Sequence, residues 1–203
     1  MKIICFARNY LTHIEELNNK IPEEAVLFLK PDTSILLKKQ PFFIPDFSND
    51  IHHELELIVK INKIGKHIDP KFAHKYYDEI SVGIDFTARD VQGKLSAEGL
   101  PWECAKSFDG ATVLGKWLPK SQFSIIDGLN IELQNNGKVV QKVNTQMMMR
   151  SIDQLIAYAS KFFTLKIGDV LFTGTPAGVS KVIAEDKLTG FLEGQEVLNI
   201  KVK

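Results

Sequence analysis

Short apolar runs rich in branched residues recur along this chain, and they restrict its fold more than any other feature. Several of the runs are bounded by Gly, Asn or Asp, which is typical of β-strands that end in turns. Asn135, Asn136 and Gly137 separate two of the runs and predict a hairpin turn. The sequence therefore predicts strands over residues 25–29, 55–61, 81–87, 130–134, 139–143, 170–173 and 196–202.

Signals for helices are fewer. Thr12 with Glu15, and Ser151 with Gln154, fit the capping box, in which two side chains satisfy free N–H groups at the helix start. Asp69, directly before a proline, predicts a third helix start. Strands outnumber helices and do not alternate with them regularly. We therefore predict an α+β fold that is mainly β, rather than a doubly wound sheet.

Size and charge narrow the classes of function. The 203 residues, 44% of them hydrophobic, fit one globular domain with a substantial core, and no repeat or Pro/Gly-rich linker divides them. Lys plus Arg (25) equals Asp plus Glu (25), so the field that would attract nucleic acid or an anionic membrane is missing. We expect neither nucleic acid nor a membrane as a partner.

The N-terminus and the cysteines predict the cellular location. The apolar run before Arg8 is too short for a signal peptide, and no later stretch reaches the length of about 18 apolar residues that spans a bilayer. Cys5 and Cys104 lack the spacing of a metal site and are expected to be reduced. These features predict a cytoplasmic protein.

Two glutamates alternate with leucines in the second predicted strand region. In a strand, Glu54 and Glu56 point to one face, and Leu55 and Leu57 point to the other. Two carboxylates about 6 Å apart would repel by roughly 3 kcal/mol at an effective dielectric of about 20, and a divalent cation would reverse that repulsion. Taken alone, a solvated outer strand face is an equally good interpretation.

An aspartate inside another apolar strand favours the cation. Asp85 lies in the run 81–87, where a buried carboxylate needs a partner. Three carboxylates, with no cysteine and no closely paired imidazole, form a hard oxygen site that suits Mg²⁺ or Mn²⁺. His52 and His53 are adjacent and face opposite sides of a strand, so at most one of them could join the glutamates.

Six segments of the chain resemble the fumarylacetoacetate hydrolase family, in order and over nearly the whole length. Within that family, LPW at 100–102 and TARD at 87–90 most resemble the acylpyruvase and oxaloacetate decarboxylase subgroup. The six segments are RNYLTHIEE (8–16), LFLKP (27–31), HELEL (53–57), DFTARDVQ (85–92), AKSF (105–108) and GDVLFTGTPAGV (168–179).

The resemblance implies a fold and a metal site. The fold would be the family's mixed β-sandwich roll with few helices, in a single catalytic domain over residues 1–203 whose residues 1–20 include a lid segment. Glu54, Glu56 and Asp85 would bind Mg²⁺ or Mn²⁺, in agreement with the strand argument. The resemblance also implies a homodimer, which no sequence feature indicates on its own.

Further site residues follow from the resemblance. Lys106 would reach toward the metal-bound substrate, Arg89 and Gln92 would line the pocket, and Gly174 and Thr175 would contact the substrate carboxylate. Without the resemblance, the lysine is interpreted as a solvated surface residue and the Gly-Thr pair as a turn that ends a strand. The glycine spacing in this segment does not fit a phosphate loop.

His13 and Glu16 lie three residues apart near the start of the helix expected after Thr12, so their side chains share one face. A helix N-terminus disfavours imidazolium, which leaves a neutral histidine that Glu16 orients and that can take a proton from water. Alone, such a pair is typical of a surface, but the resemblance places it in a lid that closes over substrate. Ala7 and Ser180 stand where the family commonly has glycine, which affects loop geometry but no proposed ligand or base.

These features predict a metal-dependent enzyme that acts on a small 2-oxo acid. The first expectation is hydrolysis of the carbon–carbon bond of acylpyruvates to a carboxylic acid and pyruvate, with oxaloacetate decarboxylation as an added activity. Oxaloacetate tautomerisation, and isomerisation or decarboxylation of 2-oxo dicarboxylates in aromatic catabolism, are close alternatives. A non-catalytic 2-oxo acid binding protein is an alternative of another class, and the pair of His13 and Glu16 argues against it because binding needs no base.

Overall fold

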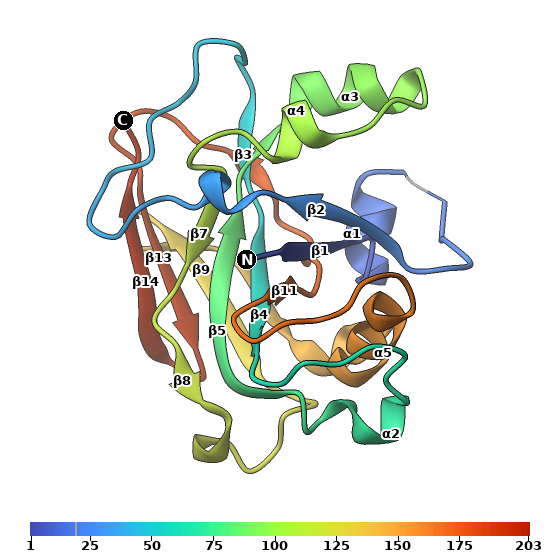
Figure 1. Ribbon diagram of the computed structural model, residues 1–203. Helices are drawn as coiled ribbons and strands as arrows, with labels where there is room; N and C mark the ends of the chain where they lie inside the picture. Colours follow the sequence, from blue (N-terminus) through green and yellow to red (C-terminus); the bar gives the residue numbers. More distant parts are fainter. Residues whose placement is uncertain (19) are drawn as a thin grey trace.

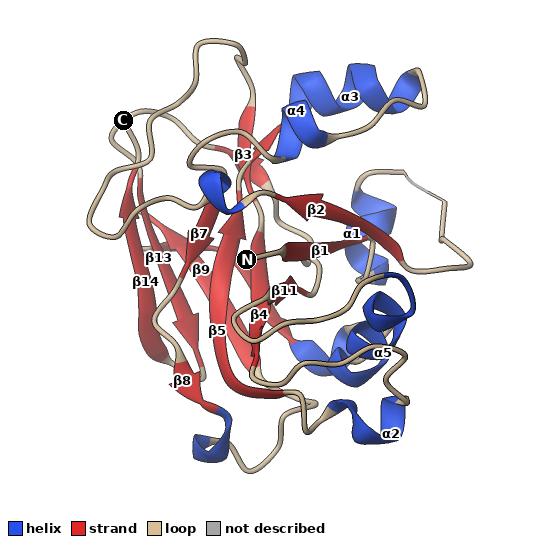
Figure 2. Ribbon diagram, in the orientation of Figure 1, coloured by secondary structure: helices blue, strands red, loops and turns tan. Residues whose placement is uncertain are grey.

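A mixed main sheet organises the chain, whose computed structural model describes residues 1–18 and 20–203 (Figures 1 and 2). Its neighbouring strands are antiparallel except β1 and β11, which are parallel. The short strand β8 (Leu118–Pro119) pairs with β5 beside this path. The strand order is β2 (Val26–Lys30), β1 (Ile3–Ala7), β11 (Val170–Phe172), β4 (Leu55–Ile61), β5 (Tyr77–Asp85) and β7 (Thr112–Leu114).

A second sheet packs against β5 and encloses the core. Leu57 of the main sheet and Leu133 and Leu188 of the second sheet are fully buried in one apolar cluster. A methyl group on Gly190 would lie 3.0 Å from a methyl of Val82, so the two sheets are in direct contact there. The second sheet has the order β10 (Lys138–Asn144), β9 (Asn130–Asn135), β13 (Lys187–Leu192) and β14 (Gln195–Lys201). The prediction of a mainly β, α+β fold is confirmed.

A small third sheet leads the chain into the site. It has the order β12 (Ser180–Lys181), β3 (Ile51–His53) and β6 (Thr87–Ala88). The predicted strand over 81–87 therefore divides between two sheets, because β5 ends at Asp85 and the N–H of Phe86 donates to the carbonyl of Ala111.

Five α-helices occur among the described residues, and they lie around the periphery of the sheets (Figure 2). Helices α2 and α5 pack together, whereas α3 and α4 lie beside β6. The longest, α5, has 11 residues, and no described helix has the length and hydropathy of a membrane span. The helices are α1 (Leu11–Glu16), α2 (Pro70–Ala73), α3 (Arg89–Ala97), α4 (Glu103–Lys106) and α5 (Ile152–Phe162).

Two of the three predicted helix starts are confirmed, and one is wrong. Ser151 forms the capping box of α5, and the carboxylate of Asp69 accepts the N–H of Lys71 at the start of α2. Helix α1 begins at Leu11 rather than after Thr12. The reason is that the preceding residue, Tyr10, is extended, wholly buried and bridged to Met148, so the helix starts directly after it.

The predicted hairpin is confirmed. Asn136 and Gly137 have φ values of 52° and 79°, as a type I′ turn requires, and β9 and β10 pair on either side. Each of the seven predicted strand regions contains a strand, with shifts of a few residues at the ends. The helices α3 and α4 were not predicted, and neither were six of the described strands: β1, β3, β7, β8, β12 and β13.

Candidate active site

One small cavity receives residues from segments that are far apart in the sequence. Its volume is about 110 Å³, and it is lined by the β1–α1 segment, β2, the β3–β4 junction, the end of β5, helices α3 and α4, and the loop after β11. By the same measure a single water needs about 10–15 Å³. The cavity therefore has room for a small organic acid and not for a dinucleotide.

Three buried carboxylates form the floor of this cavity. Glu54 lies at the junction of β3 and β4, Glu56 in β4, and Asp85 at the end of β5, and each is at most 4% exposed. They offer three oxygens that all lie within 4.8 Å of one another. Strand β4 runs between β11 and β5, so the interpretation of a solvated outer face is wrong.

The donor set of this cluster fits a hard divalent cation. Three carboxylate oxygens are the ligands that Mg²⁺ and Mn²⁺ prefer. Burial raises the pKa of Glu56 well above its ordinary value, and the neighbouring charges of Asp85 and Glu54 act in the same direction. A cation bound to the three carboxylates would lower the pKa of Glu56, because a nearby positive charge favours the ionised form of a carboxylate.

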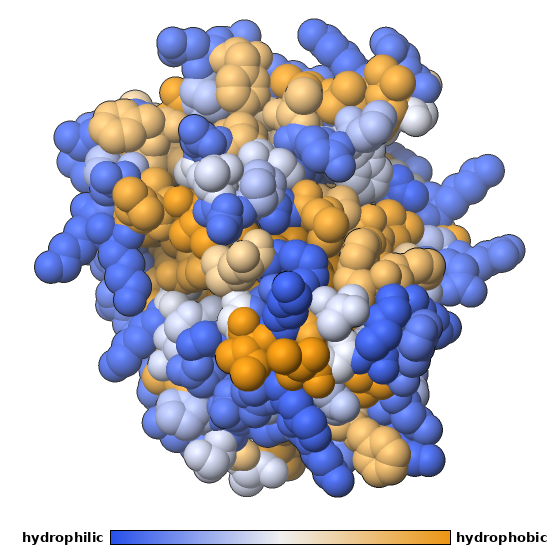
Figure 3. All heavy atoms as spheres, viewed as in Figure 1, coloured by the Kyte–Doolittle hydropathy of each residue, from blue (hydrophilic) through white to orange (hydrophobic). Residues whose placement is uncertain are grey.

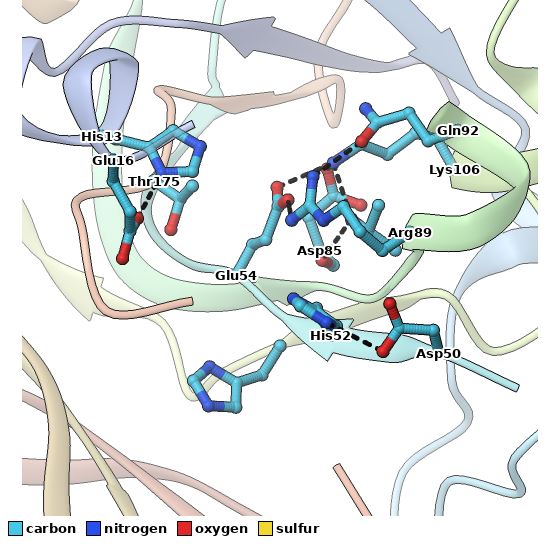
Figure 4. Close-up of polar contacts among 12 residues, drawn as sticks. His13, Glu16, Asp50, His52, Glu54, Asp85, Arg89, Gln92, Lys106 and Thr175 are labelled. Atoms are coloured by element: carbon cyan, nitrogen blue, oxygen red, sulfur yellow. Dashed lines mark hydrogen bonds and ion pairs between the residues drawn. The ribbon is translucent and has the colours of Figure 1, made fainter. Parts of the chain in front are cut away.

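Lys106 joins two of the three carboxylates (Figure 4). Its Nζ lies 2.7 Å from Glu54 Oε2 and 2.9 Å from Asp85 Oδ2, and it also donates to Thr87 Oγ1 at 2.7 Å. The side chain is buried, so the interpretation of a surface lysine is wrong. Burial lowers the pKa of Lys106, but Asp85 and Glu54 outweigh that effect and raise it above 10.5.

Arg89 completes the surroundings of Glu54. Its guanidinium donates to Glu54 Oε1 and, at 2.6 Å, to Gln92 Oε1, one turn further along α3. Burial alone would raise the pKa of Glu54, yet the charges of Lys106 and Arg89 hold it well below its ordinary value. Arg89 and Gln92 both line the cavity.

Lys30 is a further cation at the cluster that the sequence reasoning missed. Its Nζ lies 2.5 Å from Asp85 Oδ1 as an ion pair, and it donates to the carbonyl of Ala111 at 3.1 Å. Lys30 ends the apolar run of β2, and that run gives no sign that the lysine is buried, because its burial depends on a carboxylate from another strand. Lys30, Lys106 and Arg89 thus form ion pairs with two of the three carboxylates, Glu54 and Asp85.

His13 and Glu16 form a hydrogen-bonded pair at the cavity. His13 Nδ1 lies 3.1 Å from Glu16 Oε2, and the other Glu16 oxygen accepts the N–H of Gly178 at 2.9 Å. His13 is buried and lines the cavity, and its second ring nitrogen points toward the space beside Glu54 (Figure 4). The pair thus connects α1 to the loop after β11 and presents one imidazole nitrogen to the cavity.

Gly174 binds a carboxylate of the acidic cluster through its backbone, whereas Thr175 lines the cavity with its side chain. The N–H of Gly174 donates to Glu56 Oε2 at 2.5 Å, so this amide positions a carboxylate rather than a substrate. Gly174 has a φ of 103°, and a Cβ there would lie 2.8 Å from Cβ of Asn9, so glycine is required. Thr175 lines the cavity, and its hydroxyl accepts from Gln141 Nε2 at 2.9 Å.

The two histidines before Glu54 take no part in the acidic cluster. His52 Nε2 lies 3.0 Å from Asp50 Oδ1. His53 bonds through Nδ1 to Gln141 at 3.0 Å and through Nε2 to the hydroxyl of Ser180 at 2.8 Å. Gln141 was missed by the sequence reasoning, and a single glutamine in a strand carries no signal that would have found it. Both cysteines are free thiols, as predicted.

Comparison with known proteins gives similarity over the whole chain. Residues 2–203 match the family model described as fumarylacetoacetate (FAA) hydrolase, C-terminal. The chain is 40% identical over 197 residues to the oxaloacetate tautomerase YcgM of Escherichia coli K12, which covers 97% of this chain and 90% of that protein. It is 40% identical over 182 residues to a mitochondrial oxaloacetate decarboxylase of Dictyostelium discoideum, which covers 89% and 84%, respectively. The crystal structure of fumarylpyruvate hydrolase from Pseudomonas aeruginosa, in complex with Mn²⁺ and pyruvate, is similar with a TM-score of 0.94 at 30% identity and covers 100% of this chain and 89% of that one.

Proposed function

Because the chain belongs to the fumarylacetoacetate hydrolase family, we propose that it is a divalent-metal enzyme that interconverts the keto and enol forms of oxaloacetate. One observation carries this proposal: His13, which is hydrogen-bonded to Glu16, lines the same small cavity as the cluster of Glu54, Glu56 and Asp85. A proton must move between carbon and oxygen in this reaction, and the negative charge that appears on the substrate must be stabilised.

The acidic cluster supplies the metal site in this proposal. Glu54, Glu56 and Asp85 would hold Mg²⁺ or Mn²⁺ through their carboxylate oxygens. When bound, such an ion acts as a Lewis acid that polarises the 2-oxo group and stabilises negative charge on its oxygen. The amide of Gly174 keeps Glu56 in place, and Lys106 keeps Glu54 and Asp85 in place.

The protein's own groups perform the proton transfer. With His13 Nδ1 donating to Glu16, the lone pair of His13 lies on Nε2, which faces the cavity. This nitrogen would accept the proton that leaves the substrate and return it at the other position. Lys106 adds a positive charge at the floor where the oxyanion forms, and the hydroxyl of Thr175 would orient the substrate carboxylate.

Hydrolysis of acylpyruvates, the first expectation from the sequence, is the second candidate. The specific observation in its favour is again the pair of His13 and Glu16, because an oriented imidazole can equally take a proton from water. Oxaloacetate decarboxylation would use the same stabilisation of charge but no base. The binding-protein alternative gives this pair no role.

Activity measurements on the parent and on His13→Ala test this proposal. We expect loss of enol-oxaloacetate to require Mg²⁺ or Mn²⁺ and to fall about 100- to 10,000-fold in His13→Ala, the usual effect of removing a general base. Pyruvate release from acetylpyruvate should fall similarly, whereas pyruvate release from oxaloacetate should fall much less. His74→Ala, at an exposed histidine that does not line the cavity, is the matched control.

The outcomes separate the candidates. A parent that converts acetylpyruvate but not the enol of oxaloacetate would make hydrolysis the activity. Tautomerisation at the parental rate in His13→Ala would remove the proposed role of this residue. The cytoplasmic location stays a prediction, and cell fractionation tests it.

A further inference from the structure

Arg8 occupies an unusual position at the rim of the cavity. It lies between β1 and α1, is half-buried and lines the cavity together with His13. The φ of Arg8 is 58°, in the left-handed region of backbone conformation, which residues other than Gly, Asn and Asp rarely adopt. Of the seven described non-glycine residues with a positive φ, Arg8 alone lines this cavity. Such a conformation persists only where the surrounding structure enforces it.

The charges of the cavity indicate which chemical group of a ligand Arg8 would bind. Glu54, Asp85 and their partners Lys30, Lys106 and Arg89 form ion pairs at the floor. With Glu56 counted, three carboxylates face three cations, so a divalent ion would leave the floor with two positive charges. A 2-oxo acid with one carboxylate offsets only part of this charge, and Arg8 adds a further positive charge at the rim.

Apolar side chains also line the cavity. The rings of Phe28 and Trp102 meet edge to face with their centroids 6.0 Å apart, and both line the cavity, as does Leu17. A substrate in this cavity would therefore contact the charged cluster, apolar side chains and the half-buried Arg8. A second carboxylate at the far end of the substrate is the group that this arrangement fits.

We propose that Arg8 is a specificity-determining residue that binds the distal carboxylate of a dicarboxylic 2-oxo acid. The inference deepens the proposed function and rests on it for the position of the 2-oxo end. A guanidinium carries five N–H donors in a fixed fork, so Arg8 can keep its contacts with the protein and still bind a carboxylate.

Binding of two matched acids tests the inference. 2-Oxoglutarate and 2-oxopentanoate have the same chain length and differ by a distal carboxylate in place of a methyl group. Calorimetry with the metal-loaded protein should show that the parent prefers 2-oxoglutarate. Arg8→Gln should weaken 2-oxoglutarate about 10- to 100-fold, as expected for a lost hydrogen bond to a charged group, and change 2-oxopentanoate less than about threefold.

Three further variants make the result specific. Arg8→Lys should retain part of the preference because it keeps the charge. Arg8→Asn should lose it without added backbone strain, since asparagine tolerates the left-handed region, and it replaces Arg8→Gln if that variant does not fold. Lys94→Gln removes the same charge from an exposed position of α3 and should leave the preference unchanged. In kinetics, Arg8→Gln should raise KM for oxaloacetate more than it lowers kcat.

The contrary results are equally definite. The inference is wrong if the parent shows no preference, if it binds neither acid, if the preference survives in Arg8→Gln, or if Lys94→Gln abolishes it as well. A parent that prefers 2-oxoglutarate through Arg8 but does not tautomerise oxaloacetate would overturn the proposed activity and leave the role of Arg8 standing.

Discussion

At the scale of single residues, the three buried carboxylates differ in how the protein compensates their charge. Glu54 and Asp85 each form ion pairs with two cationic side chains. Glu56 accepts a hydrogen bond from the N–H of Gly174 and forms no ion pair among the described residues. Glu56 is accordingly the carboxylate whose pKa is raised, first by burial and then by its acidic neighbours. The carboxylate with the least compensation is the one that gains most from a bound ion.

A change at Glu56 should therefore weaken metal binding. We expect Glu56→Gln to lower the affinity for Mg²⁺ or Mn²⁺ by at least about tenfold, since even groups that only orient a ligand contribute that much. Isothermal titration of the purified protein measures the effect. Glu79→Gln, which alters a half-exposed partner of Lys60 on β5, is the matched control. Parental affinity in Glu56→Gln would show that the ligand assignment is wrong.

His53 makes the stability of the fold depend on pH. Burial lowers the pKa of His53 below its ordinary 6.5, although its hydrogen bond with Gln141 acts in the opposite direction. The unfolded chain therefore binds a proton more readily than the fold does. This contribution to stability is complete above about pH 6.5 and declines as the pH falls below that value.

Urea unfolding at several pH values measures this dependence. We expect the free energy of unfolding to decrease from about pH 7.5 to about pH 5.5, and His53→Gln to lose part of that slope. His74→Gln changes an exposed histidine and should keep the slope. If His53→Gln retains the parental slope, the buried imidazole is not its source.

At the scale of elements, the chemistry lies where strands and helices end. Glu54 occupies the break between β3 and β4, Asp85 ends β5, Arg89 begins α3 and Lys106 ends α4. Residues at such ends can leave the regular pattern of a strand or helix while the packed elements hold them rigidly. Helix α1 follows the same principle, because Glu16 at its end bonds to the N–H of Gly178.

The capping box of α5 gives a prediction for one element. Ser151 and Gln154 each accept a backbone N–H from the other residue, and Ser151→Ala removes one of these bonds. We expect a loss of about 1 kcal/mol in the free energy of unfolding. Ser121→Ala at an exposed position is the control, and denaturant titration measures both. Equal stabilities of the two variants would show that the cap adds nothing.

At the scale of the whole molecule, the surface carries apolar side chains (Figure 3). Phe43 and Phe47, in the segment before β3, are 66% and 53% exposed. Exposed apolar groups gathered on one protein often mark a contact with another chain. The sequence resemblance to the family implies a homodimer, and these side chains offer apolar surface for such a contact.

Light scattering tests the assembly. We predict a particle with about twice the 22.9 kDa of one chain at micromolar concentration, in the presence and absence of Mg²⁺. Dilution should move the mass toward that of one chain as the contact dissociates. A mass of one chain at every concentration would contradict the prediction.

Local patterns were enough to predict much of this molecule. The strand regions, the turn at Asn136 and Gly137, and the caps at Ser151 and Asp69 depend on residues within a few positions of one another, and all are present. The two-residue period of a strand predicts that Glu54 and Glu56 point to the same side. Their carboxylates do lie together, although Glu54 stands between β3 and β4. Neighbouring residues determine these features because the backbone has few allowed conformations.

Only the tertiary structure decided which residues meet. The interior position of β4, the start of α1 after Tyr10, and the burial of Lys30 and Lys106 against Asp85 depend on contacts between segments distant in the sequence. A buried lysine is unfavourable until a carboxylate from another strand reaches it, so its local sequence cannot reveal its place. The sequence alone thus determines seven strand regions, one turn, two helix starts and the acidic pair on one strand. The packing of the sheets assembles the cavity, because oppositely charged partners from distant segments compensate the cost of burying its charges.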